Sequence, residues 1–387
     1  MQPSTTITPE IEGEFLRLYG KEPRIFRAPG RINLIGEHTD YNEGFVMPVA
    51  IDFQVCVAIS GRDDRKLRIR STNFPDIVEI DLQTCVQPRH HWSDYVAGVA
   101  VALEQAGHSL KGADLLIHSD IPIGSGLSSS AAVEVAAGFA LLENSGIPTQ
   151  KLELAKLCRR AENEFVGARV GIMDQFISCF GRKDMALLLD CRSLDYQLLP
   201  LPACVRLVIC NTMVKHNLAV GEYNRRREEC EEAVRFLSRR LAIRTLRDLS
   251  VGELEQYATE LPPTLYRRAR HVIRENARVQ SAFSQLQRGD FIAFGRLMGE
   301  SHRSLRDDFE VSCPELDLMV ELAERHPGVF GARMTGAGFG GCTVNLVASQ
   351  AVEEFRQFVE RHYEESTGHV PEVFVSSIAD GATEVTE

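Results

Sequence analysis

The chain has 387 residues, 44% of them hydrophobic and 25% charged, which is the composition of a globular protein with a sizeable core. Its net charge of −11 argues against a broad surface for nucleic acid or an anionic membrane, while leaving room for a local cluster of cations around an anionic substrate. No apolar run approaches the roughly 20 residues that span a bilayer, and the N-terminal segment lacks the basic and apolar regions of a signal peptide, so we expect a cytoplasmic protein with no nucleic-acid or membrane partner.

The hydrophobic pattern predicts a mixed α+β chain. A helix is predicted within the first 20 or so residues, and strands are predicted at 24–28, 45–60, 66–70, 77–81, 113–119, 185–190, 206–211, 342–347 and 372–377. Helices are predicted at 92–105, 128–145, 149–165 and 352–362, and almost throughout 221–306. Within that last region the charged run 225–232 is typical of a solvated helix face.

The length indicates two domains, because it is long for a single core. The junction is expected at Pro200-Leu-Pro202, giving domains 1–200 and 201–387, with the last strand returning to the first domain. The ten cysteines are scattered, without zinc-site spacing, and in a reducing cytosol we expect buried small hydrophobes or idle thiols.

A loop of small residues at 122–132 reads PIGSGLSSSAA and lies between a predicted strand and a predicted helix. The first backbone N–H groups of a helix lack internal partners and carry partial positive charge, so such a loop suits a phosphate. Gly124 and Gly126 allow close backbone approach, and three serine hydroxyls follow them. The motif is not a Walker A loop, since no lysine follows the second glycine. Taken alone, the loop fits a serine-capped helix equally well.

The segment 27–49, RAPGRINLIGEHTDYNEGFVMPV, gathers charged residues around two turns. Arg31, Glu37, His38 and Asp40 cannot all face a core. Carboxylates accept hydrogen bonds from sugar hydroxyls, and arginine or histidine donates to them, so the cluster suits a polyhydroxylated ligand better than it suits a salt-bridged turn.

The segment 160–176, RAENEFVGARVGIMDQF, places a carboxylate at the start of a helix. Asp174 is interpreted either as a helix N-cap or as a general base for a hydroxyl nucleophile. Glu162 is interpreted either as a surface carboxylate or as a Mg²⁺ ligand together with a serine hydroxyl.

The segment 334–344, MTGAGFGGCTV, matches G-x-G-x-x-G, but its context is wrong for a dinucleotide site. That fingerprint requires a strand before the loop and a helix after it, whereas a strand is predicted here after the loop. We therefore reject hydride transfer and expect a glycine loop that abuts the ligand or the other domain.

Taken in this order, the glycine-containing segments resemble the signature motifs of the GHMP small-molecule kinases, and in particular of the galactokinase family. GRINLIGEHTDYNEGFVMP (30–48) is similar to the family's long signature, GLSSSAA (126–132) to its ATP loop and GIMDQF (171–176) to its catalytic segment. SHRSLRDDFEVSCPELD (301–317) also resembles the family, and the resemblance runs from about residue 20 to the C-terminus.

The resemblance implies a fold of two α+β domains, with mixed and antiparallel sheets, helical layers and the active site in the interdomain cleft. It implies ATP-dependent phosphorylation of galactose at its anomeric 1-OH, giving galactose 1-phosphate for galactose catabolism. Galactose and ATP would be the small-molecule partners, Mg²⁺ the metal, and the protein a monomer.

The resemblance also implies a role for individual residues. Asp174 would be the base or acceptor for the 1-OH, and Arg31 would hold it ionised and steady the transferring phosphoryl group. The sugar contacts would come from Glu37, His38, Asp40, Gly171 and Tyr223. The ATP contacts would come from Trp92 and from the loop residues Gly124, Ser125, Gly126, Leu127, Ser128, Ser129 and Ser130. Mg²⁺ would be bound by Ser130 and Glu162.

Two alternatives keep the same fold. One is a kinase of a related sugar, chiefly N-acetylgalactosamine, which would need a roomier pocket near Gly171. The other is a non-catalytic galactose sensor, in which small residues are lost from the loop at 122–132, called the serine loop below. The complete run Ser128-Ser129-Ser130-Ala131-Ala132 favours an enzyme.

Overall fold

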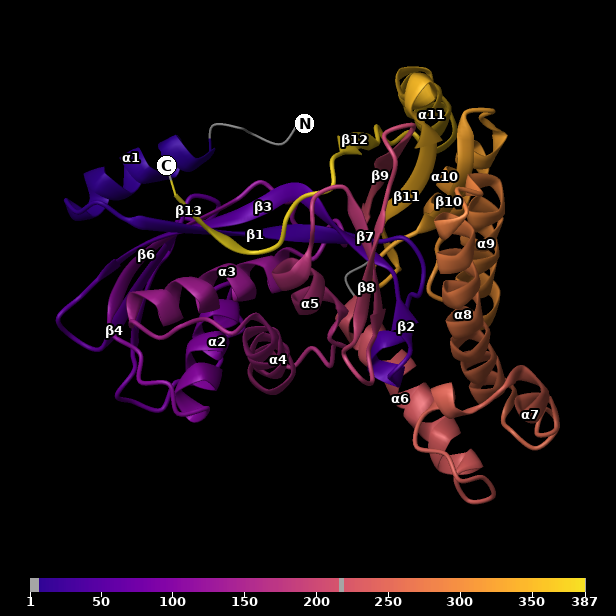
Figure 1. The fold of residues 1–387 in the computed structure, drawn as a ribbon, viewed down its shortest axis with the longest axis horizontal. Coiled ribbons are helices and arrows are strands. Elements are labelled where there is room, and N and C mark those ends of the chain that lie inside the picture. The colour runs from indigo at the N-terminus through magenta and orange to yellow at the C-terminus, as the bar shows by residue number, and fades with distance from the viewer. Residues whose placement is uncertain (1–6, 216–218, 387) are drawn as a thin grey trace.

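The computed structural model describes residues 7–215 and 219–386. The chain forms two α/β halves, with the six-stranded sheet and helices α2–α5 in one and the four-stranded sheet and helices α8–α11 in the other (Figure 1). The helices are α1 Ile7–Tyr19, α2 Asp94–Gln105, α3 Ser129–Asn144, α4 Lys151–Ala161, α5 Met173–Phe180, α6 Ala219–Leu237, α7 Val251–Glu255, α8 Pro263–Gln287, α9 Phe291–Ser304, α10 Pro314–Arg325 and α11 Val352–Thr367.

The strands form three sheets. Their bounds are β1 Arg24–Asn33, β2 Phe45–Val46, β3 Pro48–Gly61, β4 Lys66–Ser71, β5 Ile77–Asp81, β6 Ala113–Ser119, β7 Met185–Asp190, β8 Tyr196–Pro200, β9 Val205–Lys215, β10 Val329–Met334, β11 Gly340–Ala348, β12 Glu372–Ser376 and β13 Thr383–Val385. The sheet orders are β13-β1-β3-β6-β4-β5, β10-β11-β9-β12 and β2-β7-β8. All neighbours are antiparallel except β4 and β6, which are parallel.

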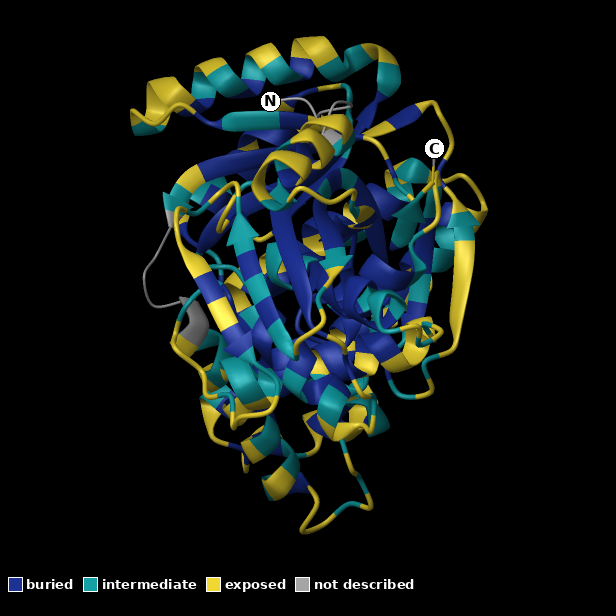
Figure 2. Cartoon of the chain, turned by 90° about the vertical axis from the view of Figure 1, so that its left-hand side faces the viewer, coloured by how far each residue is buried: buried dark blue, intermediate teal, exposed yellow. Residues whose placement is uncertain are grey.

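The main core lies between the six-stranded sheet and helices α2–α5, which cover one of its faces, while α1 covers the other (Figure 1). On α2 the residues Val96, Val99, Ala100 and Leu103 are all buried, as the helical spacing predicted. The interior strands are largely buried, whereas the outer faces of the surface helices are exposed (Figure 2). This rigid sheet-and-helix layer supports the loops that emerge at the ends of β1, β6 and α4.

The chain end joins both halves. The strand predicted at 372–377 is present as β12, but it does not join the six-stranded sheet as expected for the last strand, because it pairs with β9 in the four-stranded sheet. The following short strand β13 pairs with β1 in the six-stranded sheet. The C-terminal segment therefore runs from one sheet to the other and ties the two halves together.

Several predicted elements needed correction. The strand expected at 45–60 is split at Met47 into β2, which pairs with β7, and β3, which pairs with β1. The helix expected at 149–165 ends as an α-helix at Ala161 and continues as the π-helical segment Glu162–Val166. The sequence analysis missed α10, β8, β10 and β13. The strands β8 and β13 are short, and β8 is largely exposed, so neither of these two carries a strong periodic signal.

The charged run 225–232 is not a simple solvated face, which corrects the expectation for α6. Arg226 is only 6% exposed and Glu229 only 9%. Arg226 donates to the backbone carbonyls of Phe309 and Glu310, and Glu229 pairs with the buried Arg268. Two charges of this run, Arg226 and Glu229, therefore bind neighbouring elements, while Arg225, Glu228 and Glu232 are exposed to solvent. Among the described residues, no helix is long and apolar enough to cross a membrane.

Candidate active site

The loop between β1 and β2, residues 34–44, is folded tightly on itself. The hydroxyl of Thr39 donates to the carbonyls of Gly36 and Phe45 at 2.8 Å each. Gly36 has φ of +101°, and a Cβ there would lie 2.6 Å from the Phe45 carbonyl oxygen, so only glycine fits. The result is a compact turn that directs Glu37, His38 and Asp40 into a cavity.

That first cavity has a volume of about 220 Å³ and is lined by residues from both halves of the chain. It brings together every residue assigned to the sugar by the sequence analysis, including Gly171 and Tyr223. The lining is Arg31, Glu37, His38, Asp40, Tyr95, Ser130, Glu162, Ala168, Val170, Gly171, Met173, Asp174, Tyr223, Gly336 and Ala337.

Helix α8 holds the β1–β2 loop from behind through a stripe of buried polar residues. His271 Nε2 lies 3.1 Å from the carbonyl oxygen of Glu37, and Glu275 Oε1 accepts the Gly36 N–H at 2.9 Å. Asn276 Oδ1 accepts the Phe45 N–H at 2.9 Å. Because all three side chains come from one short stretch of one helix, His271–Asn276, the loop's position depends on where α8 lies.

The Glu37 side chain lines the cavity and is also anchored by neighbouring residues of the protein. Its Oε1 accepts the backbone N–H of Gly336 at 2.8 Å and lies 3.6 Å from a guanidinium nitrogen of Arg333. Arg333 is fully buried, and burial lowers its pKa. Glu37 therefore compensates a buried charge while its carboxylate lines the cavity.

His38 is neutral and fully engaged. Its Nδ1 lies 2.9 Å from the Tyr41 hydroxyl and its Nε2 lies 3.2 Å from the Ala337 carbonyl oxygen. Since a carbonyl only accepts, Nε2 carries the proton and Nδ1 accepts from the tyrosine. Burial lowers the pKa of His38 to about 3, with the nearby His271 acting in the same direction. The ring also contacts Tyr223 and Phe309, with centroids 5.4 and 4.8 Å away.

Asp40 and Gly171 are closely packed. A Cβ on Gly171 would lie 1.9 Å from an Asp40 carboxylate oxygen, so a glycine is required at this point of the cavity. Burial raises the pKa of Asp40 to about 6, and the charge of Asp174 adds to the shift. Asp40 is therefore a carboxylate whose ionised form is poorly compensated by the protein alone.

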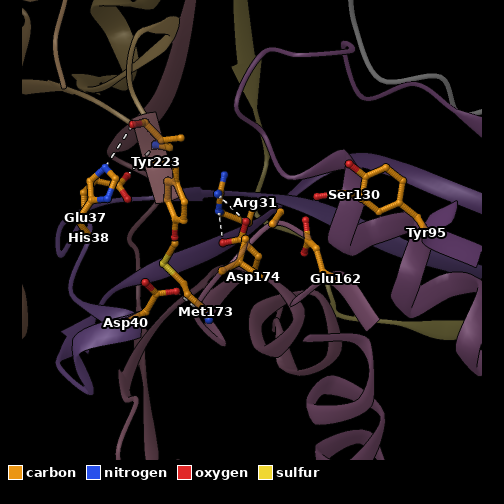
Figure 3. A pocket seen from close by; sticks show the side chains of 15 residues that line it. Arg31, Glu37, His38, Asp40, Tyr95, Ser130, Glu162, Met173, Asp174 and Tyr223 are labelled. Carbon is orange, nitrogen blue, oxygen red and sulfur yellow. Dashed lines mark hydrogen bonds and ion pairs between the residues drawn. The ribbon is translucent and has the colours of Figure 1, made fainter. Parts of the chain in front are cut away.

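Arg31 and Asp174 form the centre of the site (Figure 3). Arg31 Nε donates to Asp174 Oδ1 at 2.8 Å, and one terminal nitrogen donates to Oδ2 at 2.7 Å. The other terminal nitrogen donates to the Gly126 carbonyl, and the Ser128 hydroxyl donates to Asp174 Oδ2 at 2.8 Å. Asp174 is the second residue of α5, whose N-cap is Ile172, so it is not a capping residue.

The serine loop precedes α3 with three residues in the left-handed region. These are Gly124, Gly126 and Ser128, with φ of 71°, 80° and 64°. Such a conformation at a serine is uncommon, and it turns the hydroxyl toward Asp174. The loop is backed by the glycine loop after β10, because a Cβ on Gly336 would lie 2.9 Å from the Gly126 carbonyl oxygen.

A second cavity, of about 440 Å³, opens on the other side of Arg31 and Asp174. Four loop residues predicted to contact ATP line it, namely Gly124, Gly126, Ser128 and Ser129, together with Trp92 and with Ser130, which also lines the first cavity. Trp92 stacks on Phe74 with ring centroids 5.4 Å apart and planes 9° apart. The remaining lining is Arg31, Ser71, Asn73, Phe74, Tyr95, Ile117, Ser119, Ile123, Val133, Asp174 and Ala337.

Two predicted ATP contacts do not line either cavity. Ser125 is 1% exposed and its hydroxyl donates to the Pro122 carbonyl at 2.7 Å. Leu127 is 1% exposed and belongs to the core, while its carbonyl accepts the Arg31 N–H at 3.0 Å. Both residues shape the loop from inside.

Carboxylates outnumber cations between the two cavities. Glu162 lies beside Ser130 (Figure 3), and burial together with the charge of Asp174 raises its pKa to about 7. The fully buried Glu134 has its pKa raised well above the usual range by burial and by Glu162. Arg31 is the cation that faces this group.

A hard divalent cation fits this donor set. Mg²⁺ prefers oxygen ligands and is usually held by one or two carboxylates plus substrate phosphates, so Glu162 and Ser130 suffice on the protein side. Among residues 7–215 and 219–386, three or more His, Cys, Asp or Glu side chains nowhere gather into a group that could hold a metal ion by themselves.

Sequence analysis missed several supporting residues. Tyr95 lines both cavities from α2. Arg333, Glu275 and His271 are completely buried polar residues that support the β1–β2 loop. His271 and Glu275 lie four residues apart on α8, on one helical face, and Arg333 lies on β10. In one sequence, however, a charged helical face looks the same whether it faces water or a buried loop.

Family models match three parts of the chain. The galactokinase galactose-binding signature matches residues 13–61, and the GHMP kinases N terminal domain matches residues 94–182. The GHMP kinases C terminal model matches residues 282–365. The first match contains the β1–β2 loop and the second contains the serine loop and Asp174.

Relatives match over nearly the whole chain. It is 47% identical to the galactokinase of Roseiflexus sp. (strain RS-1) over 98% of its own length and 97% of the relative's. It is 48% identical to the galactokinase of Chloroflexus aggregans (strain MD-66 / DSM 9485), with 96% of each chain covered.

Solved structures agree with these matches. The structure of Lactococcus lactis galactokinase complexed with galactose superposes with a TM-score of 0.94 at 39% identity, covering 98% of this chain and 100% of the other. The mevalonate kinase of Methanococcus jannaschii shares the fold, with a TM-score of 0.63 at 18% identity over 92% of this chain and 98% of the other.

Proposed function

The chain belongs to the galactokinase family of the GHMP kinases and catalyses the ATP-dependent phosphorylation of galactose, and we propose that the transfer takes place at Arg31 and Asp174. The observation that carries this proposal is the position of the pair, since both residues line both cavities. A phosphoryl group passing from one cavity to the other must cross this point.

The first cavity is the galactose site in this proposal. It offers the carboxylates of Glu37 and Asp40 as acceptors for sugar hydroxyls, and Tyr223 closes one side of it. His38 has both ring nitrogens satisfied by the protein, so we assign it the task of positioning Tyr41 and Tyr223 beside the sugar. Gly171 contributes the space in which Asp40 sits.

The second cavity is the ATP site. The stacked rings of Phe74 and Trp92 offer an apolar wall for the base. The serine loop supplies backbone N–H groups at the start of α3, where the helix dipole favours the phosphates. Ser125 and Leu127 hold the loop from within.

Asp174 orients the 1-hydroxyl of galactose toward the terminal phosphate and accepts its proton as the phosphorus–oxygen bond forms, giving galactose 1-phosphate and ADP. Arg31 fixes the two oxygens of this carboxylate and places positive charge beside the transferring group. Phosphoryl transfer depends mainly on such positioning and charge stabilisation.

Mg²⁺ is the proposed metal, held by Glu162 and Ser130. When bound, it would neutralise charge on the phosphates. Without a cation, Glu162 is a buried carboxylate beside two others, which is an unfavourable arrangement that a divalent ion relieves.

We further propose a monomeric cytoplasmic enzyme with domains 1–200 and 201–387, the last strand returning to the first domain. The compartment is supported by the ten cysteines, none of which forms a disulfide and eight of which are buried, as expected where thiols stay reduced.

The test is release of ADP with Mg·ATP against galactose, N-acetylgalactosamine, glucose, arabinose, mevalonate and homoserine. Turnover with galactose well above that with the others is expected. Preference for N-acetylgalactosamine would keep the site and change the sugar. Absence of turnover together with galactose-dependent thermal stabilisation in ATP would identify a sensor.

A further inference from the structure

Two consecutive residues of helix α5, Asp174 and Gln175, have side chains that face different surroundings. Asp174 faces Arg31 at the junction of the cavities, and the next residue, Gln175, points into a buried space behind Glu162. Gln175 is 0% exposed, and its amide nitrogen donates to Glu162 Oε2 at 2.6 Å and to Glu134 Oε2 at 3.0 Å. One amide group thus bridges two buried carboxylates.

The hydrogen bond from Gln175 restricts the orientation of the Glu162 carboxylate. Glu162 is 5% exposed and sits at the junction of α4 with a π-helical segment, a local widening of the helix that is frequent at functional sites. Gln175 occupies one of its carboxylate oxygens from behind, which leaves the other free to face Ser130 and the cavity. Glu134 in turn holds the amide of Gln175 in place.

We propose that Gln175 is a positioning residue for the metal, with Glu134 as its support: the amide orients the Glu162 carboxylate so that its free oxygen and the Ser130 hydroxyl face a divalent cation. This inference rests on the proposed metal site and adds two residues to it. Second-layer partners of metal ligands typically change metal affinity by about 10–100-fold when they are removed.

The unpartnered atoms of the bridge support a directional role. Gln175 Oε1 and Glu134 Oε1 are buried and have no hydrogen-bond partner among the described residues. A buried amide retained only for stability would be expected to satisfy both its ends, since a buried polar group without a hydrogen-bond partner destabilises the fold. Here only the end that faces the carboxylates is used.

The experiment measures Mn²⁺ binding by electron paramagnetic resonance, with the protein saturated by galactose and a non-hydrolysable ATP analogue. Gln175→Met has the same length and shape but cannot donate, and we expect it to weaken Mn²⁺ by about 10–100-fold. Galactose affinity, measured without nucleotide, should stay unchanged. Mn²⁺ affinity of Gln175→Met within twofold of the parent would overturn the proposal.

Ser178→Ala is the matched control. Ser178 lies on the same helix, is 1% exposed and donates to the Pro29 carbonyl at 3.0 Å. Its loss removes one buried hydrogen bond from α5 without touching Glu162, so we expect parental Mn²⁺ binding. An equal loss in both variants would mean a general loosening of α5 and would overturn the proposal.

Two further variants keep the test decisive. If Gln175→Met does not fold, Glu134→Gln, which still accepts from the amide, should bind Mn²⁺ normally, and Glu134→Met should bind it more weakly. Equal affinity in those two variants would overturn the supporting role and the proposal with it. Glu162→Ala distinguishes failure of the proposed metal site from failure of the role proposed for Gln175. Normal Mn²⁺ binding by this variant would show that Glu162 is not a metal ligand.

Discussion

Arg31 binds Asp174 through two parallel hydrogen bonds, of 2.8 and 2.7 Å, at the point where the two cavities meet. The pair joins β1 of the six-stranded sheet to the first turn of α5. It is only partly buried, since the Asp174 side chain is 23% exposed and Arg31 8%. The carboxylate is therefore both held in one orientation and open to a substrate.

The two-pronged geometry predicts that Arg31→Lys lowers kcat by about 100-fold. A guanidinium is planar and binds both carboxylate oxygens, whereas the ammonium of lysine is a compact charge that cannot hold both in this geometry. Steady-state kinetics with galactose and ATP measure this. Arg62→Lys is the control, as Arg62 makes the same two-pronged contact with Asp64, at 2.9 and 2.7 Å, away from either cavity. Equal losses in both variants would contradict the assigned role of Arg31.

Galactose affinity should fall in acid because Asp40, whose pKa is raised to about 6, must be ionised to accept a sugar hydroxyl. Between pH 7.5 and pH 5 the dissociation constant should rise by about tenfold, the change expected for one carboxylate. Calorimetric titration without nucleotide measures it. Asp40→Asn should bind weakly with no such dependence, and the parental slope in that variant would assign the titration elsewhere.

The raised pKa of Asp40 also predicts that Asp40→Asn stabilises the folded protein near neutral pH. A folded-state pKa raised above its unfolded value contributes stability that is present below about pH 4 and lost as the pH rises through 6. Ionised Asp40 therefore destabilises the protein at pH 7.5, and Asp40→Asn should raise Tm there more than at pH 5. Scanning calorimetry at both values checks this, and equal shifts would contradict it.

Glu37→Gln should raise the KM for galactose by about 10-fold or more while leaving the KM for ATP nearly unchanged. The amide still accepts the Gly336 N–H, so this loop contact is kept, while a charged acceptor in the galactose cavity is lost together with the charge that compensates Arg333. Initial rates with each substrate varied in turn give the two constants. A rise confined to the KM for ATP would place the sugar elsewhere.

Glu275→Gln should be strongly destabilising. Glu275 accepts hydrogen bonds from Gly36, Ser301 and Arg278, and despite burial the nearby cations lower its pKa to about 2. Removing its charge leaves buried cations unpaired, at a cost of about 3–5 kcal/mol. Thermal unfolding measures the loss, and Glu353→Gln, in an exposed ion pair on α11, should leave Tm unchanged. A parental Tm for Glu275→Gln would refute the role of α8.

Much of the site was predictable because its chemistry is concentrated in short segments. The loops 30–48 and 122–132 and the segment 171–176 each carry several polar or small residues at fixed spacing, and the structure brings them into two adjoining cavities. The strands that position them also have clear periodic patterns, as at Ala113–Ser119 and Met185–Asp190, both found with the predicted bounds.

The parts that escaped prediction depend on contacts between segments far apart in the chain. Arg333 and Glu275 meet the β1–β2 loop only after folding, and nothing local distinguishes them from surface charges. Gln175 was visible in its motif, but its two carboxylate partners lie 13 and 41 residues away. Tyr95 faces the cavities from a helix whose pattern predicts only burial.

The most direct test of the account is transfer of labelled phosphate from [γ-³²P]ATP to galactose by Asp174→Asn in a single turnover. The variant should form galactose 1-phosphate more slowly than the parent by a factor of about 10³ or more, because the amide cannot accept the hydroxyl proton. Its affinities for galactose and for a non-hydrolysable ATP analogue should stay within a few-fold of the parent. Transfer at the parental rate would contradict the central role of Asp174.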